Sequence, residues 1–96
     1  MKETYIAKIL DYVGMLDEAT QGCMFKSAVA HLYGEVASFE YYCVLNPGMD
    51  SEQGQRTAKA VEDICLEILN ANGDVTKWID ELLDSVDELL MFIRSK

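Results

Sequence analysis

The sequence contains few of the residues that interrupt helices or build covalent and metal frameworks. It has one proline, one histidine and three cysteines in 96 residues. So little proline leaves room for long uninterrupted helices. The cysteines, Cys23, Cys43 and Cys65, are odd in number and form no CxxC pair, which argues against a disulfide framework and against a zinc site. We therefore expect a helical protein of a reducing compartment, the cytoplasm.

Long apolar runs are also missing. Charged residues interrupt every hydrophobic stretch before it reaches the ~20 residues that a membrane span requires. The first residues, MKETY, include an early acid and begin no apolar signal core, so we expect no secretory signal. Hydrophobic residues nevertheless make up 50% of the chain, too many for a disordered tail. Length and composition together predict a single domain over residues 1–96.

Basic residues are scarce. The chain has 8 Lys and Arg against 17 Asp and Glu, and its net charge is −9. Nucleic acid and anionic membranes would repel such a chain, so we expect it to bind neither of them directly. The charge favours a basic protein partner, or else no partner, in which case it serves solubility alone.

What the sequence does contain is helical periodicity, which is clearest over residues 23–45. Apolar residues recur there at steps of four and three, a spacing that places them on one stripe of a helix. The stripe consists of Phe25, Val29, Leu32, Val36, Phe39 and Cys43, and the opposite side of Ser27, Ala30, Gly34, Ala37 and Ser38. A helix with so little charge on either side is normally buried on more than one side. We therefore expect it to be the largely buried centre of the fold.

Three further helices are predicted: one over residues 2–17, one that follows a cap at Asp50 and is clearest over residues 56–70, and one over residues 75–93. Pro47 and Gly48 end the central helix, and Asp50 is expected to cap the next one with Gln53 as its reciprocal partner. Asp74 is expected to cap the last helix. Four amphipathic helices with short connections predict an all-α fold, a four-helix antiparallel bundle.

Within the third helix, the expected apolar face contains Val61, Ile64, Cys65, Ile68 and Leu69. Its polar side is expected to carry Glu62, Asp63 and Glu67, with Leu66 among them. Gly54 is expected to soften the first turn.

The last helix has an acidic polar side. Its carboxylates are Asp80, Glu81, Asp84, Asp87 and Glu88, with no base between Lys77 and Arg94. Like charges three or four residues apart destabilise a helix by about 0.2–0.5 kcal/mol per pair. Met91 projects from the same side and Phe92 from its edge. One interpretation is a contact surface for a Lys/Arg-rich protein, on which the carboxylates stand in for a row of phosphates. The other is an ordinary solvated face.

A second candidate surface is the small face of the central helix, formed by Ala30, Gly34 and Ala37 with Tyr41 below them. Small residues let two helix backbones approach closely. We favour packing against another helix of the same chain. The alternative is the same helix of a second copy, which would give a two-fold homodimer.

Catalytic signals are weak. His31 is expected to bond to Glu35 one turn on, and Ala28 stands where a Glu-x-x-His iron motif needs glutamate. No nucleophile, oxyanion donor or phosphate loop is evident, so we expect no enzyme, no metal and no cofactor. Among the aromatic residues late in the central helix, Phe39 is expected in the core, while Tyr41 is left open between core and interface.

The leading hypothesis is a non-enzymatic binding protein that docks its acidic face on a basic site of a larger protein, such as one that handles nucleic acid. By fold and charge alone, small acidic helical proteins include phage-encoded inhibitors of bacterial defence. The alternative is a secretion or assembly chaperone, or a toxin-immunity protein, that holds a partner helix in an apolar groove.

Overall fold

The computed structural model describes residues 2–18, 23–48, 50–72 and 75–95, and these residues form four α-helices. The helices are α1 (Lys2–Glu18), α2 (Cys23–Leu45), α3 (Ser51–Asn70) and α4 (Thr76–Arg94). The predicted all-α fold is confirmed. None of the four helices combines the length and apolar character that crossing a membrane would require.

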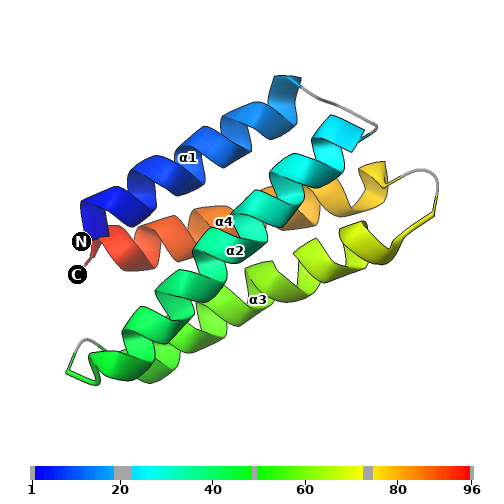
Figure 1. Cartoon of the computed structure of the whole chain (residues 1–96). Coiled ribbons are helices and arrows are strands. Elements are labelled where there is room, and N and C mark those ends of the chain that lie inside the picture. Colours follow the sequence, from blue (N-terminus) through cyan, green and yellow to red (C-terminus); the bar gives the residue numbers. More distant parts are fainter. Residues whose placement is uncertain (1, 19–22, 49, 73–74, 96) are drawn as a thin grey trace.

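The helices run antiparallel to their sequence neighbours, so that both ends of the chain lie at the same end of the bundle (Figure 1). Neighbours in sequence pack against one another, and α1 and α4 meet over a shorter stretch. In the described part of the chain, the backbones of the diagonal pairs α1/α3 and α2/α4 do not approach each other. Each helix therefore occupies one corner of an elongated bundle that measures 42 × 20 × 18 Å.

The core is built from the apolar stripes that the four-three spacing predicts. Every residue of the predicted α2 stripe is buried, from Phe25 to Cys43. The α4 stripe is buried at Leu82, Val86, Leu89 and Ile93, while Ile79 is half-buried. Fully burying one such side chain contributes about 1.5–3 kcal/mol, so these two stripes supply much of the driving force for folding.

The opposite side of α2 is not buried, which corrects the expectation that this helix is buried on more than one side. Ser27, Ala30, Gly34 and Ser38 are exposed, and only Ala37 is half-buried. A four-cornered bundle has no central position. Because α1 and α3 flank α2 and α4 lies diagonally across, no helix of the chain remains to cover the outer side.

The turn between α2 and α3 differs from the predicted capping box. Asp50 has a φ of 57°, in the left-handed region, and its side chain does not cap α3. Instead, Ser51 Oγ donates a hydrogen bond to the Cys43 carbonyl at 2.6 Å, and Asn46 Nδ2 donates to the Tyr42 carbonyl at 2.8 Å. Both bonds go to carbonyls in the last turn of α2, where the Cys43 carbonyl also accepts a hydrogen bond from the Asn46 N–H at 3.2 Å. With this turn in place, α3 begins at Ser51, directly after the expected cap position.

The start of α4 also differs by one residue. The predicted cap, Asp74, lies outside the described residues. Val75 occupies the N-cap position, and its carbonyl accepts the first hydrogen bond, from the Trp78 N–H at 3.0 Å.

Gly54 is a packing residue rather than a weak point of α3. It is buried, and a Cβ atom built on it would lie 2.6 Å from Cys43 Sγ and 3.0 Å from Phe92 Cε2. The absence of a side chain therefore lets α2, α3 and α4 converge at this end of the bundle.

Candidate functional site

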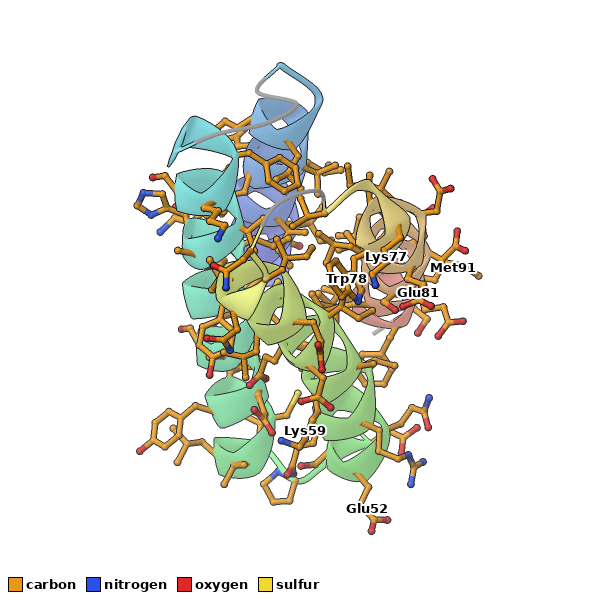
Figure 2. All side chains as sticks on the ribbon, turned by 90° about the vertical axis from the view of Figure 1, so that its right-hand side faces the viewer. Glu52, Lys59, Lys77, Trp78, Glu81 and Met91 are labelled. Atoms are coloured by element: carbon orange, nitrogen blue, oxygen red, sulfur yellow. The ribbon has the colours of Figure 1, made fainter. Side chains whose placement is uncertain are left out.

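The predicted acidic side chains of α4 all lie on the surface. We call the exposed residues Asp80, Glu81, Asp84, Asp87, Glu88 and Met91 the α4 acidic face. Figure 2 shows Glu81 and Met91 projecting from α4 on the side turned away from α2. Met91 is 69% exposed, the largest exposed fraction among the large hydrophobic residues that the structure describes.

The carboxylates of this face have no cationic partner within the described part of the chain. The ion pairs found there join Lys8 to Glu35 at 4.0 Å and Lys59 to Asp63 at 3.9 Å. Lys77, the base nearest to the face along α4, lies over the Trp78 ring at 4.4 Å from its centroid. The bases that the structure describes therefore do not neutralise the negative charges of the face.

A shallow hollow lies beside the α4 acidic face, between α3 and α4. Its lining residues are Gln53, Thr57, Glu88, Met91, Phe92 and Ser95. Phe92 is 8% exposed and packs edge-on against Phe39, with ring centroids 6.4 Å apart, so it belongs to the core and not to the contact surface. The exposed apolar group beside the carboxylates is Met91 alone.

The small face of α2 is open to solvent. Ala30 and Gly34 are exposed, and a Cβ atom built on Gly34 would have nothing within 4 Å. The preferred interpretation, that another helix of the chain fills this groove, is therefore wrong. Tyr41 is 64% exposed, and Val44 and Leu45, which the sequence analysis did not single out, are exposed beside it.

Glu62 is buried, which corrects its placement on the polar side of α3. It is 7% exposed, and its Oε2 atom is buried without a hydrogen-bond partner among the described residues. Its neighbour across the α2–α3 interface is Glu40. The register offered a signal: Ala58, Glu62, Cys65 and Leu69 are spaced by four, three and four residues, so Glu62 lies on the core-facing stripe.

Burial raises the pKa of Glu62 to about 7, and the hydrogen bond and negative charge of Glu40 add to the shift. The Lys59 charge acts in the opposite direction, and the Asp63 charge raises the pKa further. Glu62 therefore retains a proton in conditions in which an exposed glutamate has lost it. The proton lies at the α2–α3 interface, where Glu62 and Glu40 form a hydrogen bond.

A second shallow groove lies between α2 and α3, lined by Glu40, Gln55, Arg56, Lys59, Ala60 and Asp63. Two of its polar side chains bond to neighbouring residues of α3: Arg56 donates to Gln53 Oε1 at 2.6 Å, and Gln55 Nε2 donates to Ser51 Oγ at 2.9 Å. Lys59 and Asp63 form an ion pair at 3.9 Å. The lining residues include no Ser, Thr, Cys or His.

Cys43 and Cys65 are buried, free thiols. Burial raises the pKa of Cys65 to about 12, with a smaller contribution from the Glu62 charge. Burial likewise raises the pKa of Cys43, and the Glu40 charge adds to it. Both therefore stay protonated at neutral pH and pack as small hydrophobic groups, as predicted from their positions on the apolar stripes.

His31 is exposed and stacks on Tyr12 of α1, with ring centroids 5.5 Å apart and an interplanar angle of 14°. The predicted partner, Glu35, is oriented towards Lys8. Within the described residues, no three His, Cys, Asp or Glu side chains converge as a metal site would require. Compared with protein-family models, curated proteins and solved structures, the chain has no significant match.

Proposed function

We propose that this chain is a non-enzymatic binding protein that docks its α4 acidic face on a basic surface of a larger protein and blocks that surface to nucleic acid. The observation that carries the proposal is the row of exposed, unneutralised carboxylates from Asp80 to Glu88. Like charges at this spacing oppose helix formation by about 0.2–0.5 kcal/mol per pair. A role as a contact surface would explain why the helix retains these destabilising like-charge pairs.

The charge density of the face suits a site that normally binds nucleic acid. Five carboxylates lie between Asp80 and Glu88, over about 12 Å of helix axis at 1.5 Å per residue. This spacing is roughly one charge per 3 Å, close to the ~3.4 Å per phosphate along one DNA strand. A protein surface whose lysines and arginines match phosphates would therefore meet a similar field on α4.

Met91 and the neighbouring hollow supply the short-range part of the contact. Long-range charge speeds association, whereas buried apolar anchors slow dissociation. Met91 is exposed at one end of the carboxylate row and lines the hollow beside it. A partner side chain that enters the hollow would contact Met91 while its basic neighbours face Glu88.

The proposal is tested with two double variants that change the net charge equally. D84K/D87K reverses the centre of the α4 acidic face, and D11K/E67K reverses exposed carboxylates of α1 and α3. Each protein is titrated, at low and at high salt, with a lysine- and arginine-rich peptide and then with the basic host proteins that the wild type retains. We expect D84K/D87K to weaken binding at least tenfold, through slower association, and D11K/E67K to weaken it far less.

Competition with nucleic acid completes the test. A retained partner should release its nucleic acid on adding the wild type or D11K/E67K, but not on adding D84K/D87K. Equal binding by both double variants would mean that only net charge matters. The α4 acidic face would then be a solvated surface, and the proposal would fail.

A further inference from the structure

The exposed side of α2 is an uncharged stripe on an otherwise acidic molecule. We define the α2 outer stripe as Ser27, Ala30, His31, Gly34, Ala37, Ser38, Tyr41, Val44 and Leu45, of which Ala37 is half-buried and the others are exposed. The stripe contains no Asp, Glu, Lys or Arg. Its members recur at three- and four-residue steps, directly opposite the buried stripe.

The formal charges of α2 are all engaged within the chain. Lys26 donates a hydrogen bond to the Ala71 carbonyl at the end of α3, at 2.8 Å. Glu35 pairs with Lys8 of α1 at 4.0 Å, and Glu40 faces Glu62 of α3. Lys26, Glu35 and Glu40 are accordingly half-buried at the flanks of the helix. The solvent side is left free of formal charge along the whole of α2.

We infer that the α2 outer stripe is the contact between two copies of this chain, which pair through α2 about a two-fold axis near Gly34. A basic partner would find no charge to bind on this stripe. Two copies, each with a net charge of −9, repel one another, and the stripe is the surface on which they meet without opposing like charges.

The stripe also has the shape for such a contact. It extends about 27 Å from Ser27 to Leu45 at 1.5 Å per residue, and a second copy presents a stripe of the same length. Ala30, Gly34 and Ala37 allow the two backbones to approach closely at the crossing point. Tyr41, Val44 and Leu45 bring the exposed apolar surface that the contact would bury.

The resulting dimer keeps the α4 acidic faces accessible. Since α2 and α4 lie on diagonal corners of the bundle, pairing through α2 leaves each α4 acidic face on an outer side of the dimer. The dimer would thus present two docking surfaces. This inference does not depend on the proposed function, because self-association is measured on the protein alone.

The test is sedimentation equilibrium of the purified chain. A contact between single helices is small, so we expect a dissociation constant of about 10–100 µM. The average mass should rise from 10.8 kDa towards twice that value as the concentration increases from about 5 to 500 µM. Added NaCl should strengthen the dimer, because it screens the repulsion between the acidic copies.

Gly34 and Gly14 provide a matched pair of variants. Both are exposed helical glycines with nothing within 4 Å of a built Cβ atom, so glutamate fits the monomer at either position. G34E places a charge at the proposed crossing point and should weaken the dimer at least tenfold, whereas G14E should dimerise nearly as the wild type does. Circular dichroism checks that both variants fold. A wild type that stays monomeric in high salt, or equal effects of the two variants, would overturn the inference.

Discussion

At the residue scale, the glycines show that the atoms packed around a residue determine how its substitution changes stability. Gly14 and Gly34 are open, whereas Gly54 is packed against Cys43 and Phe92. We expect Gly14→Ala and Gly34→Ala each to raise the free energy of unfolding by about 0.5–1 kcal/mol, because alanine is the better helix former. Gly54→Ala should lower it by about 1–3 kcal/mol, because the new methyl group overpacks the junction of three helices. Urea unfolding at low protein concentration measures all three, and a Gly54→Ala protein as stable as the wild type would contradict the packing at this junction.

Glu62 gives a pH prediction whose sign follows from its raised pKa. Burial and Glu40 raise the pKa from 4.5 to about 7, so the folded state binds this proton more tightly than the unfolded state does. The stabilisation is fully present below pH 4.5 and is lost as the pH rises towards 7. Glu62→Gln keeps the shape of the side chain and its ability to donate a hydrogen bond, but cannot ionise. We expect it to match the wild type near pH 4.5 and to be more stable by about 3 kcal/mol at pH 8.

The control for this prediction is Glu67→Gln, on the same helix at an exposed position. Denaturant unfolding from pH 4.5 to 8 should show a stability difference from the wild type that grows with pH for Glu62→Gln and stays flat for Glu67→Gln. A flat difference for both variants would mean that Glu62 ionises in the folded state as easily as in the unfolded chain.

Glu62 and Gly54 mark the limit of prediction from the sequence at the residue scale. Leu66 was correctly placed outside the apolar face of α3, because it falls off the four-three register. Glu62 lies on that register, but a glutamate is rarely buried, so it was expected on the polar side. Gly54 could not be interpreted from its neighbours in sequence at all, because Cys43 and Phe92 approach it from other helices.

At the element scale, the inner faces of the helices were predictable and the outer face of α2 was not. The buried stripe of α2 follows from its spacing alone, and the structure confirms it. Small, uncharged residues on the other side also suggested burial. Their exposure follows from the number of helices: four helices enclose one core, and each keeps an outer side. Low charge on a helix therefore predicts a contact without saying whether the chain itself supplies the partner.

Helix ends were less predictable than helix faces. The breaker Pro47-Gly48 marks the end of α2, as expected. Asp50 occupies the N-cap position with a left-handed backbone, but its side chain forms no capping hydrogen bond. Ser51 instead bonds back to α2. Which of several polar residues near a turn forms the bond depends on backbone angles that adjacent side chains do not determine.

The α4 acidic face gives a prediction at this scale, since it opposes the stability of its own helix. Asp84→Lys removes like-charge neighbours one turn away, at Asp80 and Glu88, and replaces them with opposite-charge pairs. We expect the free energy of unfolding to rise by about 0.5–1 kcal/mol while binding to a basic partner weakens. Asp11→Lys, which changes the net charge equally but has Lys8 one turn away, should gain less. A destabilised Asp84→Lys protein would show that Asp84 has a structural partner in α4.

At the scale of the whole molecule, the surface has two distinct sides, one along α4 and one along α2, because these helices lie on diagonal corners of the bundle. One corner carries the α4 acidic face and the diagonal corner carries the uncharged α2 outer stripe, while the core between them is ordinary bundle packing. Composition predicted that the molecule is acidic. The helical spacing also placed the uncharged side of α2, but only the folded structure shows that this side is exposed and that Lys26, Glu35 and Glu40 contact other parts of the chain.

The net charge of −9 also predicts how stability responds to salt. Self-repulsion in the compact state is screened as the Debye length shortens from about 30 Å at 0.01 M to about 8 Å at 0.15 M ionic strength. We expect the wild type to gain stability over that range, whereas docking on a basic partner weakens over the same range. D84K/D87K and D11K/E67K carry the same reduced charge, so we expect both to show a smaller salt dependence of unfolding than the wild type. Only D84K/D87K is expected to lose most of its binding. Urea unfolding at several NaCl concentrations measures this response, with sucrose as an uncharged control for general solvent effects. If D84K/D87K alone flattened the response, the repulsion would be local to α4, and net charge would not be its source.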